Sequence, residues 1–217
     1  MKSIILIAPP AAGKGTEAAQ ITADYNIPSI STGDLLRGAR NGNDEKAAII
    51  RKIQDEGGLV PDEIVLELLR DRISQTDCES GYILDGFPRS VSQAQAYDKI
   101  LEEMNRDAGI VIVLDIDKEI AKSRICGRFT CPSCKRIYNA NTEDMKPKEL
   151  GLCDDCNIEL IQRSDDNPET YDERYNTYLE KTEPLISYYD KKGIVYHVDS
   201  SESPSATHAQ VVKILGE

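Results

Sequence analysis

The sequence lacks any apolar run that approaches the roughly 20 residues of a membrane-spanning helix. Its first apolar stretch, residues 4–7, is also shorter than the roughly 7–15 apolar residues of a signal-peptide core. Basic residues are in deficit, because 26 Lys and Arg face 38 Asp and Glu, for a formal net charge of −12. A general nucleic-acid binder needs a basic surface. We therefore expect a cytoplasmic protein that binds neither membranes nor nucleic acids.

Internal repeats and low-complexity tracts are absent as well. With 217 residues, 40% hydrophobic and 29% charged, the chain is long enough for one substantial core that carries one or two inserted lobes. Six cysteines in a chain expected to be cytoplasmic do not indicate a disulfide framework.

Short apolar runs alternate with helical patterns along most of the chain. We predict strands at residues 3–8, 28–31, 82–84, 110–116 and 194–198. Helical patterns cover residues 16–25, 62–74, 90–105, 118–125 and 205–215, and a long tyrosine-rich pattern covers 167–191. Such alternation predicts a parallel sheet with helices on both faces. Residues 32–60 and 127–164 break the alternation and are predicted to form inserted lobes.

Residues 4–17, IILIAPPAAGKGTE, come close to the phosphate-binding pattern G-x-x-x-x-G-K-[ST] between a strand and a helix. Ala8 stands where the first glycine belongs, and Ala11 occupies a second small position. In this context backbone N–H groups would converge on an anion at the helix N-terminus, with Lys14 at the β- and γ-phosphates and Thr16 near the metal. By itself the stretch is compatible with a phosphate loop or with a chance strand–helix turn.

Asp85 follows the apolar strand at residues 82–84, as a carboxylate that binds Mg²⁺ does in many parallel α/β sheets. The alternative is an ordinary Asp-Gly turn. Guanidinium groups suit a cleft that collects several phosphate charges. Six arginines fall in loops, helix starts or the expected lobes: Arg37, Arg89, Arg124, Arg128, Arg163 and Arg174. Taken singly, a surface arginine is more often only a solvated residue.

Four of the cysteines form two C-x₂-C pairs, Cys131 with Cys134 and Cys153 with Cys156. The 18 residues between the pairs match the four-thiolate zinc pattern. A closed tetrahedral site of this kind is structural and not catalytic.

Together these stretches resemble the adenylate kinases, P-loop kinases of nucleoside monophosphates, in their long form with a zinc-bearing lid. The landmarks cover nearly the whole chain: PPAAGKGT (9–16), STGDLLR (31–37), GGLVPDEIV (57–65), LDGFPRSVSQA (84–94), RICGR (124–128), the cysteine pairs and QRSDDNPETYDERY (162–175). The resemblance implies an α/β three-layer fold with a five-stranded parallel sheet. Its expected domains are a core of residues 1–30, 61–126 and 165–217, an AMP-binding lobe of residues 31–60 and a zinc-binding lid of residues 127–164.

The implied activity is reversible phosphoryl transfer from Mg·ATP to AMP, giving two ADP, by a monomer. The residues implied in ATP binding are Ala11, Ala12, Gly13, Lys14, Gly15, Thr16, Arg124, which would stack on adenine, and Arg128. Those implied in AMP binding are Thr32, Arg37, Leu59, Val60, Gly86, Arg89, Gln93, Arg163 and Arg174, with Gln93 reading the adenine edge. The catalytic set is Lys14, Asp85, Arg89, Arg128, Arg163 and Arg174, and Asp34 would help Asp85 to order the water shell of Mg²⁺.

The chain departs from the family pattern at several positions. Ala8, Pro9 and Ala11 alter the phosphate loop, and Glu17 replaces a usual glutamine and adds negative charge nearby. Phe129 and Asn139 replace a common arginine and a common histidine of the lid. The alternatives that we weigh are a kinase for another nucleoside monophosphate, a catalytically weakened nucleotide sensor and a zinc-ribbon binding module, the last disfavoured by the acidic charge.

Overall fold

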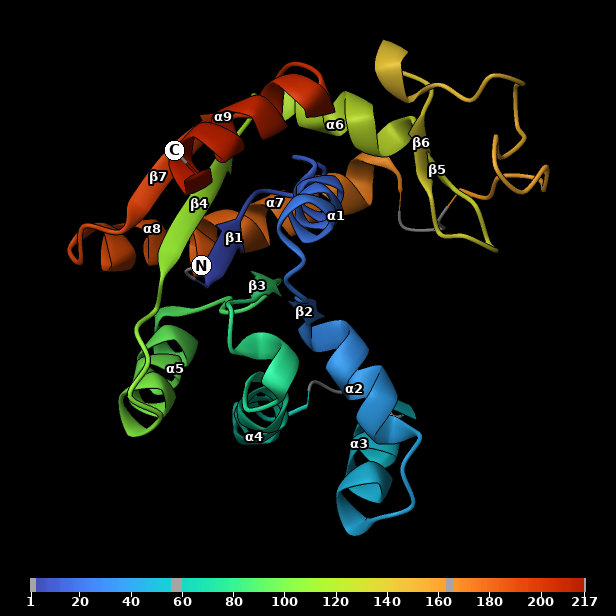
Figure 1. Ribbon diagram of the computed structural model, residues 1–217. Helices are drawn as coiled ribbons and strands as arrows, with labels where there is room; N and C mark the ends of the chain where they lie inside the picture. The colour runs from blue at the N-terminus through green and yellow to red at the C-terminus, as the bar shows by residue number, and fades with distance from the viewer. Residues whose placement is uncertain (1–2, 56–59, 163–165, 217) are drawn as a thin grey trace. The chain divides into compact units, whose positions relative to one another are not determined.

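The structure, a computed structural model, describes residues 3–55, 60–162 and 166–216. Five strands form one sheet of order β2-β3-β1-β4-β7 (Figure 1). Their bounds are Ile4–Ile7 for β1, Ser29–Ser31 for β2, Ile83–Asp85 for β3, Ile110–Asp115 for β4 and Val195–Asp199 for β7. The five predicted strands and the parallel α/β fold are thus confirmed.

The central strands are buried along nearly their whole length, as expected when helices cover both faces of a parallel sheet. All four residues of β1 are buried, and so are the first five of β4. The strands β1 and β2 each pair in parallel with β3. The register places Leu6 and Ser31 on either side of Asp85, so these three strands end at the same edge of the sheet.

Helices occupy the segments between the strands. They are α1 (Lys14–Tyr25), α2 (Thr32–Arg40), α3 (Glu45–Asp55), α4 (Asp62–Ile73), α5 (Val91–Glu103), α6 (Lys118–Cys126), α7 (Pro168–Thr177), α8 (Pro184–Asp190) and α9 (Pro204–Gly216). The tyrosine-rich pattern at 167–191 is divided between α7 and α8 by a π-helical turn, Tyr178–Thr182. Pro184 follows that turn and has no N–H to donate, so α8 begins there. Among the described residues, no helix is both long and apolar enough to cross a membrane.

The chain divides into two compact units. Unit 1 comprises Met1–Ile7, Ala18–Ile112 and Lys181–Tyr196, and unit 2 comprises Ala8–Glu17, Val113–Glu180 and His197–Glu217. Within unit 1, α2 packs against α3 and α4, and α5 packs against α4 and α8. Within unit 2, α6 packs against α7, and a hairpin pairs β5 (Arg128–Thr130) with β6 (Ile137–Asn139) (Figure 1). The division into core, AMP-binding lobe and lid remains a prediction.

Candidate functional site

In unit 1, the ends of β2 and β3 bring two predicted binding residues together. Ser31 is paired with Asp85 in the sheet, so the residues that follow, Thr32 and Gly86, are neighbours. The Thr32 hydroxyl donates a hydrogen bond to the Gly86 carbonyl oxygen at 3.5 Å, and Thr32 is buried. Parallel α/β sheets bind their ligands at this carboxyl edge.

Arg89 and Gln93 join the same edge through the turn that follows β3. Arg89 Nε donates to the Gly86 carbonyl oxygen at 2.7 Å, which fixes the base of the guanidinium group. The Arg89 backbone N–H donates to Gln93 Oε1, also at 2.7 Å. The two terminal nitrogens of Arg89 have no partner among the described residues, and the side chain is exposed. The family resemblance assigns four of these residues to AMP, the acceptor of the phosphoryl group, and we call them the acceptor cluster: Thr32, Gly86, Arg89 and Gln93.

The other residues expected to bind AMP are less closely assembled. Arg37 pairs with Asp34 one turn earlier on α2, at 2.5 Å, and both side chains are exposed. The Asp34 carboxylate therefore has a basic partner of its own, and its expected help to Asp85 remains a prediction. Val60 is half-buried directly before α4. Leu59 and Arg163 lie outside the described residues.

In unit 2, the segment before α1 has the backbone of an anion-binding loop. Ala11 and Gly13 have positive φ angles of 64° and 92°. The helix begins at Lys14, and the bond from the Glu17 N–H to the Gly13 carbonyl oxygen measures 2.9 Å. The first N–H groups of an α-helix have no acceptor within the helix itself. Such N–H groups, together with the helix dipole, attract an anion.

The two loop alanines differ in their backbone conformation. Ala11 stands in the left-handed region, where a Cβ atom costs roughly 1–2 kcal/mol, whereas Ala8 is not among the described residues with positive φ. The Ala11 methyl group packs against the buried cluster of Ala121, Ile125 and Tyr171 from α6 and α7. This contact partly offsets the strain.

Glu17, in the first turn of α1, has a partner that the sequence did not reveal. Its side chain is buried, and Oε1 lies 2.8 Å from Nδ1 of His208 on α9. The Glu17 carboxylate, which the sequence places near the phosphate loop, therefore contacts a histidine side chain. A pair separated by 191 positions leaves no local pattern in the sequence.

Two arginines expected at the ATP site make extensive contacts within unit 2. Arg124 donates to the carbonyl oxygens of Ser200, Ser201 and Glu202 at 2.6, 3.0 and 2.5 Å. Burial lowers the pKa of its guanidinium group. Hydrogen bonds in the guanidinium plane leave the flat faces for stacking, which is the role expected for this residue.

Arg128, at the start of β5, forms a bidentate ion pair with Asp166. Its Nε donates to Asp166 Oδ2 at 2.8 Å, and its Nη2 contacts Oδ1. The Asp166 side chain is fully buried, whereas 16% of the Arg128 side chain is exposed. Asp166 lies within the landmark at residues 162–175, but the sequence pattern assigns it no role. Arg174, the remaining arginine of this set, lies in the last turn of α7.

The four paired cysteines converge in unit 2. Their Sγ atoms all lie within 4.8 Å of one another, and those of Cys134 and Cys153 are 3.6 Å apart. A zinc tetrahedron with Zn–S bonds of about 2.3 Å has edges of about 3.8 Å. Four thiol groups at this spacing therefore fit one Zn²⁺ ion with no open position.

Both C-x₂-C segments have the same turn. The Lys135 N–H donates to the Cys131 carbonyl oxygen at 3.1 Å, and the Asn157 N–H donates to that of Cys153 at 2.9 Å. Lys135 and Asn157, each directly after the second cysteine of its pair, have positive φ angles of 65° and 53°. Two equivalent turns of this kind aim four thiols at one point.

A tyrosine supports one of these thiols. The Tyr138 hydroxyl lies 3.4 Å from Cys153 Sγ and accepts a hydrogen bond from the Asp154 N–H at 2.8 Å. The contact with Tyr138 lowers the pKa of Cys153 to about 6. Burial raises the pKa of Tyr138 to about 12, so the phenol keeps its proton for the thiolate. A thiolate is the form of cysteine that binds a metal.

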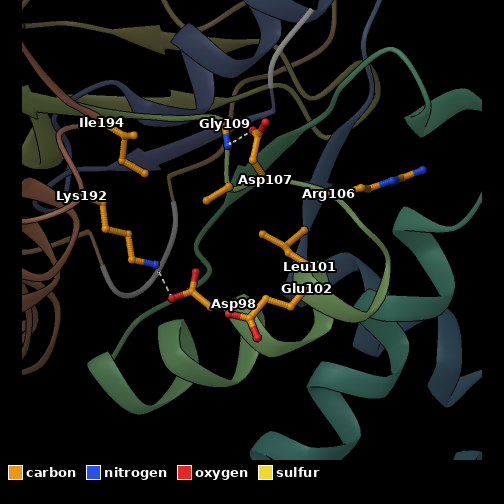
Figure 2. A pocket seen from close by; sticks show the side chains of 9 residues that line it. Asp98, Leu101, Glu102, Arg106, Asp107, Gly109, Lys192 and Ile194 are labelled. Atoms are coloured by element: carbon orange, nitrogen blue, oxygen red, sulfur yellow. Dashed lines mark hydrogen bonds and ion pairs between the residues drawn. The ribbon is translucent and has the colours of Figure 1, made fainter.

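A separate cavity of about 350 Å³ lies in unit 1 (Figure 2). It is lined by α5, by the segment that leads into β4, and by Lys192 and Ile194. Lys192 forms an ion pair with Asp98, and the Gly109 N–H donates to Asp107 at 2.9 Å. The cavity lies at the amino end of β4, away from the strand ends that carry the acceptor cluster, and no predicted site residue lines it.

The comparisons with known proteins bear on the family of this chain. The model of the family described as adenylate kinase matches residues 6–194. The chain belongs to the adenylate kinase family. An adenylate kinase of Thermotoga neapolitana is 45% identical over 217 residues, which cover 100% of this chain and 98% of that protein. One from Thermotoga maritima is 44% identical over the same shares. One from Archaeoglobus fulgidus is 44% identical over 98% of this chain and 97% of that protein.

Membership of the family makes the protein a nucleotide-binding kinase that transfers phosphoryl groups to nucleoside monophosphates. The acceptor cluster and Asp85 belong to unit 1, whereas the phosphate loop, Arg124, Arg128 and Arg174 belong to unit 2. The structure describes each set by itself. That the two sets form one active site is part of the proposal below.

Proposed function

We propose that the protein catalyses reversible, Mg²⁺-dependent phosphoryl transfer from ATP to AMP, giving two ADP. The observation that carries the proposal is the acceptor cluster at the carboxyl edge of the sheet, in a chain that belongs to the adenylate kinase family. The names of the relatives support ATP and AMP as the substrates.

AMP binds at the acceptor cluster in this proposal. Arg89 Nε is held by the Gly86 carbonyl oxygen, so the guanidinium group is oriented before the ligand arrives. Its two terminal nitrogens then donate to the AMP phosphate with little side-chain entropy left to lose. Gln93, in the first turn of α5, meets the adenine edge, and Arg37 adds a second guanidinium group at the phosphate.

ATP binds at the loop that leads into α1. The N–H groups of Lys14, Gly15 and Thr16 surround the phosphates, and the Lys14 side chain reaches the β- and γ-phosphates. The flat face of Arg124 supports the adenine. Asp85 and Thr16 supply oxygen atoms, the donors that Mg²⁺ prefers, and the ion when bound neutralises charge on the ATP phosphates.

The reaction needs no general base, because the attacking AMP phosphate oxygen is already ionised near neutral pH. Catalysis then consists of in-line positioning and of arginine side chains placed around the transferring group. Arg128, Arg163 and Arg174 fill that role. Closure of the zinc-bearing lid excludes water, which would otherwise hydrolyse ATP. The zinc ion is structural, because a lobe of under forty residues has little core of its own.

A coupled assay of ADP formation from ATP and AMP tests the function. We expect ADP only when both nucleotides and Mg²⁺ are present. If nucleotides bind but no ADP forms, the protein is a nucleotide sensor, and if another monophosphate is the better acceptor, the substrate assignment is wrong.

The residue assignment is tested by Arg89→Ala. We expect kcat/KM for AMP to fall by at least ~100-fold, or about 2.7 kcal/mol, as for the loss of a charged contact that strengthens in the transition state. The matched control is Arg70→Ala in the same unit, because Arg70 forms an exposed ion pair with Glu103. A loss below tenfold for Arg89→Ala, or an equal loss in both variants, would contradict the assignment.

A further inference from the structure

We propose that Asp62 is a specificity-determining residue that fixes the amide of Gln93 in the orientation that accepts a 6-aminopurine monophosphate and rejects a 6-oxopurine one. The inference rests on the proposed function, in which Gln93 reads the base of the acceptor. It concerns a residue that neither the sequence patterns nor the comparisons singled out.

Gln93 is held at both ends of its amide by groups of opposite character. The Arg89 backbone N–H donates to Oε1 at 2.7 Å, and Nε2 donates to Asp62 Oδ1 at 2.6 Å. All three residues belong to unit 1, and Asp62 is the first residue of α4, which packs against α5. Gln93 is half-buried and Asp62 is exposed.

These two partners determine which way the amide points. A backbone N–H can only donate, and a carboxylate can only accept. If the amide turned over, Nε2 would face the Arg89 N–H and Oε1 would face the Asp62 carboxylate. Both contacts would then be repulsive, so the observed orientation is the one that the surroundings enforce.

The fixed amide still has one lone pair on Oε1 and one N–H on Nε2 for a ligand. A 6-aminopurine presents an amino donor next to the N1 acceptor, which matches an oxygen beside an N–H group. A 6-oxopurine presents a carbonyl acceptor next to an N1–H donor, which is the reverse order. Binding the 6-oxopurine in the same position would require the amide orientation that Asp62 opposes.

The position of Asp62 in the chain agrees with this role. It lies two residues after Val60, which the family resemblance places in the adenine pocket, and it begins the helix that follows. A carboxylate in the first turn is also favoured by the helix dipole. The substitution that tests the inference must therefore separate the effect on the amide from the effect on the helix.

The experiment compares AMP with IMP as acceptors for Asp62→Ala, with Glu63→Ala as the matched control. Glu63 is the next first-turn carboxylate of α4, is exposed and makes no hydrogen bond or ion pair with a described residue. We expect Asp62→Ala to lower the ratio of kcat/KM for AMP over IMP by about fivefold to tenfold. Glu63→Ala should leave the ratio within twofold of the parent while costing the helix a similar amount of stability.

Asp62→Asn provides a rescue test, because its amide oxygen can accept from Gln93 Nε2 while its NH₂ group can also donate. Its ratio should lie between those of the parent and Asp62→Ala. An AMP/IMP ratio in Asp62→Ala within twofold of both the parent and the control would overturn the inference. Calorimetric binding of AMP and IMP gives the corresponding ratio of dissociation constants without turnover. If the parent forms no ADP, the proposed function is refuted, and the binding ratios of the parent and Asp62→Ala still test the role of Asp62.

Discussion

The two histidines of the chain provide a matched pair for testing how the phosphate loop is supported. His208 Nδ1 lies 2.8 Å from Glu17 Oε1, and 15% of the His208 side chain and 2% of the Glu17 side chain are exposed. His197 Nδ1 lies at the same 2.8 Å from Asp115 Oδ2, but 56% of the His197 side chain and 53% of the Asp115 side chain are exposed. Both pairs join a histidine Nδ1 to a carboxylate oxygen at the same distance, so His208→Ala and His197→Ala compare a buried pair with an exposed one.

We expect His208→Ala to lower the free energy of unfolding by about 2–3 kcal/mol. Breaking a buried pair costs about 3–5 kcal/mol where the remaining group keeps no partner, and the other interactions of Glu17 place the expected loss below that range. Water entering the space left by the partly exposed imidazole reduces that cost. His197→Ala should cost between 0 and about 1 kcal/mol, as other exposed pairs do. For a protein of this size, the first loss lowers Tm by about 4–12 °C.

Thermal and urea unfolding of both variants measure the difference. The double variant Glu17→Gln, His208→Ala should recover part of the loss, because a neutral amide costs less to bury than a carboxylate that has lost its histidine partner. Equal losses for His208→Ala and His197→Ala, or a double variant less stable than His208→Ala alone, would refute the reasoning.

Three further predictions concern the metal, the loop and acid stability. Elemental analysis of the parent should find one Zn²⁺, and a metal-free parent would contradict the zinc site. Cys153→Ser should lose the ion and melt at a lower temperature, with some activity left in the cold. Cys126→Ser, the control, should keep the ion. Ala11→Gly should bind ATP a few-fold more tightly, with AMP binding unchanged, and unchanged ATP binding would contradict this. Its free energy of unfolding should stay within about 1 kcal/mol of the parent's. Relief of the φ strain at residue 11 stabilises the variant, whereas the lost methyl contact and the more flexible unfolded chain destabilise it. The hydrogen bond from Lys122 lowers the pKa of Asp172, so its stabilisation is present above the ordinary pKa of about 3.9 and is lost as the pH falls through the folded value. Asp172→Asn should therefore be less stable than the parent at neutral pH and equal to it in strong acid, and a difference that persists in acid would exclude this cause.

The features that the sequence predicted are those encoded by neighbours along the chain. The strands were visible as apolar runs, and β1 and β4 are buried as such runs require. The four-cysteine cluster was visible because each C-x₂-C turn supplies two thiols from four consecutive residues. The turn in each segment gives Lys135 and Asn157 positive φ angles, which the cysteine spacing alone does not predict.

The features that the sequence did not predict depend on contacts between distant segments. Asp166 and His208 are ordinary polar residues in their own stretches, and only the fold brings them to Arg128 and Glu17. The position of the π-helical turn between α7 and α8 was likewise hidden within one continuous tyrosine-rich pattern.

The phosphate loop shows how far a pattern reaches before geometry must decide. Ala8 and Ala11 are equal departures from the glycine pattern, yet Ala11 alone of the two is among the described residues with a left-handed backbone. A substitution is strained where φ is positive, and the letter at that position does not reveal φ. The contact of Ala11 with α6 and α7 also has no signal in the loop itself, because its partners lie more than 100 residues away. Packing against α6 and α7 therefore supports Ala11, so variants in α6 or α7 that remove this contact should destabilise the loop without altering its sequence.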